Sequence, residues 1–252
     1  MKTVQFGSRL FEPELIIFDK DGTLTDFKKT WIPIFEKRIE LILQRLGINN
    51  LPDKIMADLY MSYGICGQDV DAYGPFPYST PWEDEIIFAT VLYKFGIPWQ
   101  KAKNTARYCI EKAEELLDRI KITELYYGVT EVLEELRGSG ILLSLATADL
   151  SSIAADILKF LKIHDLFDDI VGADMVENDK PDPEMIHKTV NALNVDIKKT
   201  VLVGDSIIDM EMGKRAKMGL VVGVLEGGVA SKKDLAQDAD VIISSVRDIK
   251  VI

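Results

Sequence analysis

The sequence has few of the residues that build zinc sites and disulfide frameworks. Its 252 residues include two cysteines and two histidines, and the cysteines form no CxxC pair. Zinc sites and small disulfide-bonded domains both draw on clusters of such residues, so we expect neither here. Cys66 and Cys109 are expected to be reduced thiols.

Long apolar runs and an excess of positive charge are also missing. No apolar run is long enough to span a bilayer, and the N-terminal segment MKTVQFGSRLFEPE lacks the apolar region of a signal peptide. The formal net charge is −11, so the field of the whole protein repels polyanions. We therefore expect a cytoplasmic protein with no nucleic-acid partner and no membrane partner.

What the sequence does have is a set of short apolar runs that stop abruptly at polar residues. Such runs, bounded by turn residues, are typical of buried strands. The six runs, of which the last two are weaker, are 14–18, 141–146, 200–203, 240–243, 169–172 and 220–224. Helical periodicity lies between many of them, over 130–137, 151–162, 185–193 and 208–218, with Ser151 or Ser152 as the expected N-cap of the second helix. This alternation predicts an α/β fold with a doubly wound, mostly parallel sheet.

Residues 27–122 interrupt the alternation. Apolar residues recur there at helical spacing over 30–46, 53–63, 82–95 and 98–120, and no buried strand is evident. The stretch 64–81 is rich in glycine, proline and aromatic residues and predicts an ordered loop. We therefore predict a helical domain over 27–122, inserted after the first strand of a core formed by 1–26 and 123–252.

Acidic and hydroxyl side chains follow three of the predicted strands. In open α/β sheets, ligands bind outside the carboxyl ends of the strands, so these side chains are expected to converge. They are Asp19, Asp21, Thr147, Asp205 and Asp209. Lys180 lies in a predicted loop over 179–183, from which it can reach the same place.

Several carboxylates this close together repel one another and are costly to bury unpaired. A hard divalent cation removes this cost, and magnesium favours a few carboxylates together with water and phosphate oxygens. The predicted site therefore requires Mg²⁺, with Asp205 as a natural ligand and Asp209 placed either to assist the metal or to orient Lys180. The cation and the lysine together would make the site a receptor for phosphate.

Chemistry on phosphorus suits this set of groups. Asp19, at a strand tip, can attack phosphorus and form an aspartyl-phosphate. Asp21 is placed to protonate the leaving oxygen and later to deprotonate water. The Thr147 hydroxyl, the Ala148 amide and the Lys180 ammonium can hold the remaining oxygens of the transferring group.

Four segments occur in a definite order along the chain: DKDGTLTD at 19–26, Thr147, KPDP at 180–183 and GDSIIDM at 204–210. In this order they resemble motifs I to IV of the haloacid dehalogenase-like (HAD) superfamily in its phosphatase form, across 15–224. The resemblance implies that Asp19 is the nucleophile and Asp21 the general acid and base. It also implies that Asp19, Asp205 and the Asp21 carbonyl hold Mg²⁺. Further residues are implied in supporting positions: Asp209, Gly22 and Ser206.

The insert resembles the type 1 (C1) helical cap of phosphoglycolate-phosphatase-like members, in which the cap closes over the site and supplies substrate contacts. One position departs from the family pattern. Motif II commonly continues as a Ser/Thr-Asn pair, whereas this chain has Thr147-Ala148-Asp149. Asp149 adds a negative charge near an anion site, and the resemblance assigns it no role.

Three functions are compatible with these features, in a protein expected to be a monomer or a homodimer. The leading one is a Mg²⁺-dependent phosphomonoesterase that hydrolyses a small phosphorylated metabolite. The second is a phosphomutase of the β-phosphoglucomutase type, which needs basic cap residues; the candidates are Lys28, Lys94, Lys101, Lys103 and Arg107. The third is a non-catalytic, phosphate-binding regulatory protein.

Simpler interpretations exist for the same residues. Asp19 and Asp21 could be turn formers, Asp205 a helix N-cap, and Asp26 an N-cap or hinge where the insert begins. Five aromatic residues could either shape a substrate pocket or pack the insert: Trp31, Tyr73, Phe76, Tyr78 and Trp82.

Overall fold

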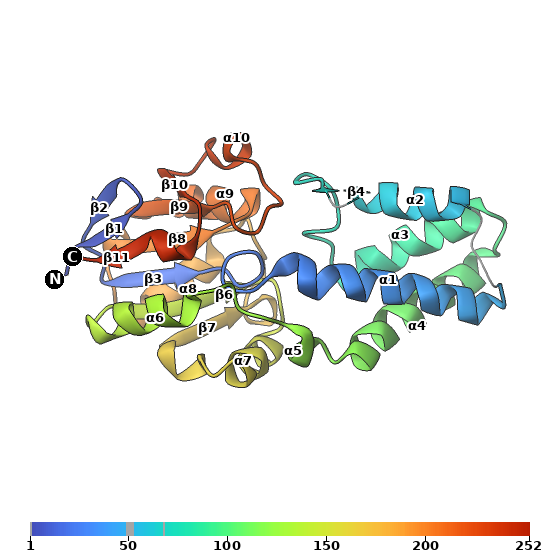
Figure 1. Cartoon of the computed structure of the whole chain (residues 1–252), viewed down its shortest axis with the longest axis horizontal. Helices are drawn as coiled ribbons and strands as arrows, with labels where there is room; N and C mark the ends of the chain where they lie inside the picture. Colours follow the sequence, from blue (N-terminus) through green and yellow to red (C-terminus); the bar gives the residue numbers. More distant parts are fainter. Residues whose placement is uncertain (1, 49–52, 68) are drawn as a thin grey trace. The chain divides into compact units, whose positions relative to one another are not determined.

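The computed structural model describes residues 2–48, 53–67 and 69–252 (Figure 1). The chain forms two compact units, one of Met1–Lys28 with Thr123–Ile252 and one of Lys29–Ile122. We call the first the sheet unit and the second the helical unit. The assignment of a catalytic core to 1–26 and 123–252 and of a cap to 27–122 stays a prediction.

The sheet unit is built, within the described residues, on a six-stranded parallel sheet of order β10-β9-β8-β3-β6-β7. Its strands are β3 (Leu15–Phe18), β6 (Leu142–Thr147), β7 (Asp169–Gly172), β8 (Thr200–Gly204), β9 (Leu220–Val224) and β10 (Val241–Ile243). Every residue of β3, β8 and β9 is buried, and a strand covered on both faces needs apolar residues at successive positions. The predicted doubly wound, mostly parallel α/β sheet is therefore confirmed.

Helices cover both faces of this sheet. They are α6 (Val129–Gly138), α7 (Ser151–Phe160), α8 (Glu184–Leu193), α9 (Ile207–Arg215) and the short α10 (Lys232–Leu235). Leu133 of α6 belongs to one core cluster with Ile16 of β3. Leu202 of β8 points to the opposite face, because Ile16 pairs with the residue before it. There, a Cβ added to Gly213 of α9 would lie 3.0 Å from Leu202 and 2.8 Å from Val221.

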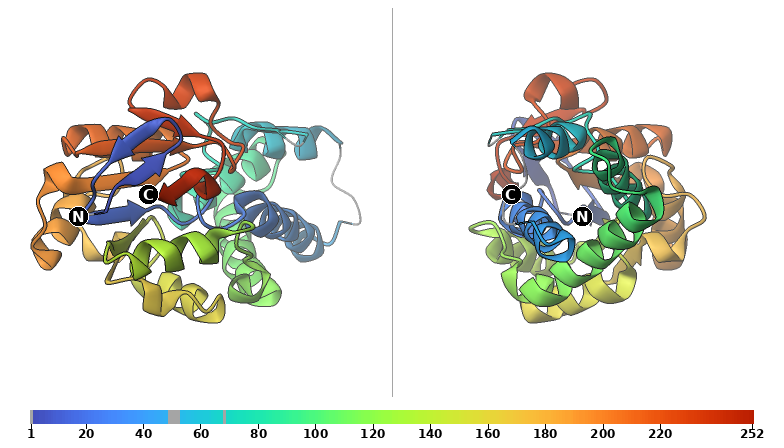
Figure 2. Two further views of the ribbon diagram at one scale, coloured as in Figure 1. Left: turned by 60° about the vertical axis from the view of Figure 1, so that its left-hand side comes forward. Right: turned by 90° about the vertical axis from the view of Figure 1, so that its right-hand side faces the viewer.

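A second sheet, of three short antiparallel strands, was not expected from the sequence. Its order is β11-β1-β2, with β1 at Val4–Phe6, β2 at Arg9–Phe11 and β11 at Ile249–Val251. Figure 2 shows this pairing of the first and last strands of the chain. Three-residue strands give too few positions for an alternation to be visible, although Val4 and Phe6 are fully buried in the core of the sheet unit.

The expected N-cap of α7 is wrong. Leu150 occupies the N-cap position and makes no side-chain capping bond. Ser151 instead donates from its backbone N to Asp174 Oδ1 at 2.6 Å and from its Oγ to Asp174 Oδ2 at 2.8 Å. A carboxylate from outside the helix thus takes up the amide that a local cap would otherwise bind.

The helical unit contains five described helices, the first of which begins in the sheet unit. They are α1 (Phe27–Leu46), α2 (Asp53–Tyr63), α3 (Pro81–Lys94), α4 (Trp99–Leu117) and α5 (Arg119–Ile122). The predicted helix over 98–120 is interrupted at Asp118, which has a left-handed φ of 50°. The predicted loop over 64–81, of which residue 68 lies outside the described residues, contains two-residue strands β4 (Ile65–Cys66) and β5 (Asp69–Val70). None of the described helices is long and apolar enough to cross a membrane.

An aromatic cluster and a buried ion pair hold the helical unit together. The Phe35 ring lies 5.0 Å from that of Tyr63 and 5.6 Å from that of Phe76, both edge-on. The Arg38 side chain, 4% exposed, donates from Nη1 to Asp84 Oδ2 at 2.7 Å. Phe76 therefore packs the unit, which is the simpler of the two interpretations of that residue.

Candidate functional site

Three neighbouring strands of the sheet unit end at the same edge with polar residues. β3 lies between β6 and β8, and Phe18 pairs with Leu145 on one side and Val203 on the other. Asp19 follows directly, and its backbone N donates to the Val203 carbonyl at 2.9 Å. The parallel register therefore brings Asp19 level with the ends of both neighbouring strands.

Lys180 bridges two of the predicted carboxylates. Its Nζ lies 2.6 Å from Asp19 Oδ1 and 2.7 Å from Asp209 Oδ1, with 3% of the side chain exposed. Residues that are far apart in the sequence, after β3, after β7 and in α9, thus meet around one ammonium group. Asp209 was considered either for assisting the metal or for orienting Lys180, and this contact favours the second role.

Asp209 is itself held by the start of α9. Ser206 is the N-cap, and its Oγ donates to Asp209 Oδ2 at 2.5 Å while accepting from the Asp209 N at 3.2 Å. This reciprocal capping box fixes one carboxylate oxygen on the helix and leaves the other for Lys180. Ser206, not Asp205, is therefore the helix cap.

The Asp205 carboxylate lies against two glycines, Gly22 and Gly227, where a larger residue would collide with it. A Cβ at Gly22 would lie 2.0 Å from Asp205 Oδ2, and one at Gly227 would lie 2.3 Å from the same oxygen. Gly22 also has a φ of +88°, which disfavours any other residue. Thr23 Oγ1 approaches Asp205 Oδ1 at 3.4 Å. This carboxylate is buried, and its side-chain hydrogen bond from Thr23 is long.

The acids of this edge form a cluster that suits a hard cation. Carboxylate oxygens of Asp19, Asp205 and Asp209 lie within 4.8 Å of one another. Burial raises the pKa of Asp19 to about 7; the Lys180 ammonium opposes this rise, and the Asp209 carboxylate adds to it. Burial, with repulsion from Asp19 and Asp209, also raises the pKa of Asp205 well above its usual value. Three carboxylates share one ammonium group here, and anionic oxygen ligands are those that Mg²⁺ prefers, so the residues fit this ion.

The pKa of Lys180 is raised above its usual value, so that the side chain keeps its positive charge. Burial alone would lower that pKa, but the Asp19 and Asp209 carboxylates outweigh it and raise it. The ammonium group therefore stays protonated and can neutralise part of the charge on Asp19 and on a bound phosphate.

Asp21 lies outside the three-carboxylate cluster. Its Oδ2 accepts from Lys20 Nζ at 2.6 Å and its Oδ1 from Thr25 Oγ1 at 2.8 Å. The side chain is 19% exposed, more than those of the neighbouring acids. A metal ligand from this residue would therefore be its backbone carbonyl, as the resemblance implies, with the carboxylate left for proton transfer.

Sequence reasoning gave no role to Lys20 and left that of Asp149 open. The two lie 3.1 Å apart, with 1% of the Lys20 side chain exposed. A lysine inside the Asp-x-Asp motif was visible in the sequence, but its partner could be identified only from the packing of β3 beside β6.

The remaining predicted phosphate ligands lie at the end of β6. Thr147 is buried, and its Oγ1 accepts from the Asp149 N at 3.2 Å. Ala148 is exposed. Their contacts with phosphate stay predictions.

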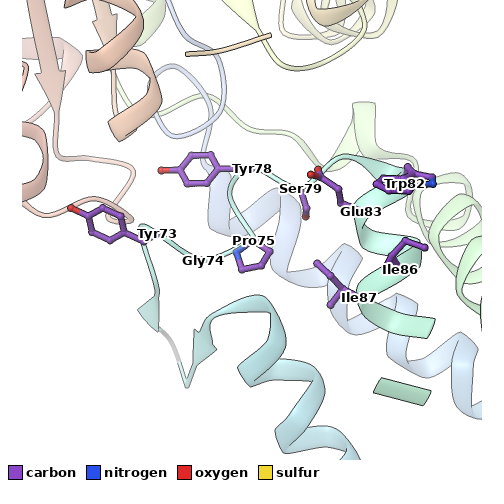
Figure 3. A pocket seen from close by; sticks show the side chains of 9 residues that line it. All are labelled: Tyr73, Gly74, Pro75, Tyr78, Ser79, Trp82, Glu83, Ile86 and Ile87. Carbon is purple, nitrogen blue, oxygen red and sulfur yellow. The ribbon is translucent and has the colours of Figure 1, made fainter. Parts of the chain in front are cut away.

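The helical unit has a pocket of its own, with a volume of about 400 Å³ (Figure 3). Tyr78, Ser79 and Pro75 reach it from the loop before α3, and Glu83 and Ile87 from α3 itself. Tyr73 and Trp82 also line it, so three of the five aromatic residues considered for a pocket lie there. Trp31 instead packs against the Arg119 guanidinium, 5.0 Å from its ring.

A family model described as haloacid dehalogenase-like hydrolase matches residues 87–223, more than half of the chain. The match includes Thr147, Lys180 and Asp205 and begins after Asp19. A probable phosphatase, IndB, from Dickeya dadantii is 28% identical over 93% of this chain and 91% of its own length. A phosphoglycolate phosphatase from Neisseria meningitidis is 28% identical over 94% and 92%. The pyrophosphatase PpaX of Halalkalibacterium halodurans is 34% identical, but over 51% of this chain and 60% of its own.

Solved structures share the fold of the chain. A hydrolase of HAD subfamily IA from Geobacter sulfurreducens superposes with a TM-score of 0.65 at 18% identity, over 96% of this chain and 97% of its own. A candidate β-phosphoglucomutase from Thermotoga maritima has a TM-score of 0.65 at 24% identity, over 93% and 95%.

Proposed function

The chain belongs to the haloacid dehalogenase-like hydrolases, and from that premise we propose a Mg²⁺-dependent phosphomonoesterase that works through an aspartyl-phosphate on Asp19. The observation that carries the proposal is the bridge from Asp19 through Lys180 to Asp209, next to the buried Asp205. It supports the proposal because the carboxylate proposed to attack phosphorus, a permanent cation and the oxygens proposed to bind the metal lie at one edge of the sheet.

The reaction has two balanced steps. In the first, an oxygen of Asp19 attacks the substrate phosphorus, the bond to the leaving oxygen breaks, and a proton from Asp21 goes to that oxygen. In the second, a water oxygen attacks the phosphorus of the aspartyl-phosphate and gives a proton to Asp21. Inorganic phosphate leaves, and the Asp19 carboxylate is regenerated.

The cation site would be formed by Asp19, Asp205 and the backbone carbonyl of Asp21. A bound Mg²⁺ would supply shielding of the negative charge shared by the carboxylates and the phosphate. Lys180 adds a second positive charge from the protein, and Asp209 holds it in place. The Thr147 hydroxyl and the Ala148 amide would hold the remaining phosphate oxygens.

The proposed substrate is a small phosphorylated metabolite. Relatives that match over most of this chain are named phosphoglycolate phosphatases, from Neisseria meningitidis and from Aquifex aeolicus. A partial match is to a pyrophosphatase. We therefore place 2-phosphoglycolate and inorganic pyrophosphate first in a panel of phosphate esters and anhydrides.

The phosphomutase alternative shares the fold, and the likeness to the Thermotoga maritima structure at 24% identity shows the fold alone. A mutase also needs basic side chains for a second phosphate. Two of the candidates already have acidic partners: Lys94 lies 2.5 Å from Asp58, and Arg107 lies 2.8 Å from Glu85. Activation of turnover by a sugar bisphosphate would identify a mutase.

The test is phosphate release from this panel with Mg²⁺ and with chelator, comparing the wild type with Asp19→Asn. We expect Mg²⁺-dependent release by the wild type and none above background by Asp19→Asn, with little loss of stability because a repelling buried charge is removed. Asp165→Asn, at a fully exposed carboxylate, is the matched control and should keep wild-type turnover. Retained turnover in Asp19→Asn would exclude Asp19 as the nucleophile.

A further inference from the structure

Lys20 is a buried lysine that the two-step reaction above does not use. Its Nζ lies 2.6 Å from Asp21 Oδ2 and 3.1 Å from Asp149 Oδ2. The side chain is 1% exposed, and the two contacts named here are both with carboxylates of the protein. The contacts made by Lys20 therefore serve its neighbours, Asp21 and Asp149.

The backbone around Lys20 is held as firmly as its side chain. The Lys20 carbonyl accepts from the backbone N of Leu24 and of Thr25, each at 2.9 Å, and lies 3.2 Å from Thr25 Oγ1. The same Thr25 Oγ1 donates to Asp21 Oδ1 at 2.8 Å. Leu24 and Thr25 thus close the turn that carries Asp21 back onto the Lys20 carbonyl.

Both oxygens of the Asp21 carboxylate are therefore bound within one turn, one by Thr25 and the other by Lys20. A carboxylate held at both oxygens has little freedom to rotate, and this favours a fixed geometry for proton transfer. Thr25 belongs to the same turn and moves with it. Lys20 has a contact outside that turn, with Asp149 after β6.

We propose that Lys20, anchored by Asp149, is a positioning residue that holds the Asp21 carboxylate in the orientation needed for proton transfer. This inference rests on the proposed function, in which Asp21 is the general acid and base. It gives Asp149 a role that the family pattern does not assign: the carboxylate fixes the lysine from the neighbouring strand. Lys180 and Lys20 then have parallel tasks, the first toward Asp19 and the second toward Asp21.

The leaving group of the substrate separates this role from a purely structural one. An alkyl phosphate releases a poor leaving group that must be protonated as the bond to phosphorus breaks. A p-nitrophenyl phosphate releases a stable phenolate and depends little on an acid. Misplacing Asp21 should therefore slow the first substrate much more than the second, whereas general damage to the site should slow both alike.

The experiment measures kcat and KM for an alkyl phosphate and for p-nitrophenyl phosphate, with saturating Mg²⁺, in the full-length wild type and its variants. The variants are Lys20→Met, Lys20→Arg, Asp149→Asn and the exposed-surface control Lys188→Met. Lys20→Met should lower kcat on the alkyl phosphate about tenfold more than on p-nitrophenyl phosphate, with KM changed by less than about twofold. Lys20→Arg should recover part of the loss, and Asp149→Asn should show the same selectivity to a smaller degree.

Equal losses on the two substrates, or no loss in Lys20→Met, would overturn the positioning role while leaving the phosphatase assignment intact. If Lys20→Met does not fold, the isosteric Asp149→Asn decides: selective loss on the alkyl phosphate supports the role, and an unchanged ratio of the two kcat values rejects it. A wild type that hydrolyses neither substrate would overturn the proposed function, and this inference with it.

Discussion

Replacing Lys180 by methionine removes an ammonium group that lies between the buried carboxylates of Asp19 and Asp209. Its Nζ is 2.6 Å from Asp19 Oδ1 and 2.7 Å from Asp209 Oδ1, and 3% of the side chain is exposed. Methionine has a similar length and keeps most of the packing. The change in stability should therefore report the lost charge more than lost volume.

The size of the effect follows from these distances. At an effective permittivity of about 20, each pair attracts by about 6 kcal/mol. Desolvation of the three buried ions offsets much of this attraction. Removing one partner nevertheless leaves the carboxylates buried and uncompensated, which typically costs about 3–5 kcal/mol. We expect a loss of that size in the free energy of unfolding of the metal-free protein.

Urea unfolding at pH 8 with chelator measures this loss, and Lys188→Met, on the exposed face of α8, is the matched control. The double variant Lys180→Met with Asp209→Asn should be more stable than Lys180→Met alone, because one of the two carboxylates left without a counter-charge is removed. A loss below about 1 kcal/mol in Lys180→Met, with an unchanged dependence on urea, would show that the bridge contributes little and would refute the electrostatic reasoning.

Two further predictions concern the cation site. Gly22→Ala should weaken Mg²⁺ binding at least about tenfold by calorimetry, because its Cβ would lie 2.0 Å from Asp205 Oδ2 at a φ of +88°. The control Gly96→Ala, at a φ of +89° with nothing within 4 Å, has the backbone strain alone and should bind Mg²⁺ normally. Equal weakening in the two variants would contradict the steric argument. The second prediction follows from burial, which raises the pKa of Asp19 from 3.8 to about 7, so that the folded state holds this proton more tightly than the unfolded state. The extra stability is complete below the unfolded pKa and is lost as pH rises through about 7. In chelator, the melting temperature of the wild type relative to that of Asp19→Asn should therefore fall between pH 5.5 and 8, and a rise over that interval would rule out the proton linkage.

The site residues that the sequence predicted directly are those that follow the end of one strand. A buried parallel strand is an apolar run, so the ends of β3 and β8 could be located, and with them Asp19 and Asp205. The partners of Lys20, and the choice between the two roles considered for Asp209, could not be derived in this way, because they depend on which strands are neighbours and on the path of a loop. The capping box of Ser206 and Asp209 was present as a sequence pattern, but Asp209 was considered for assisting the metal or orienting Lys180, and Ser206 only as a supporting residue.

The strands β1, β2 and β11 show a different reason for failure. Each has three residues, and the pairing joins the two ends of the chain. Local patterns carry no information about a contact between residues 4 and 251. Their burial in the core of the sheet unit becomes evident only when the whole chain is folded.

The distribution of charge explains why Asp205 is the residue we expect to anchor the cation. Lys180 is shared by Asp19 and Asp209, and Lys20 by Asp21 and Asp149, so four carboxylates of this edge each have a lysine within 3.1 Å. Asp205 has none among the described residues and has a threonine hydroxyl at 3.4 Å instead. Gly22 and Gly227 both lie against its Oδ2, so closely that a Cβ on either residue would collide with that oxygen. A buried carboxylate without a directly paired counter-charge favours binding of a proton or a cation, and at neutral pH a Mg²⁺ ion held jointly with Asp19 would satisfy both acids.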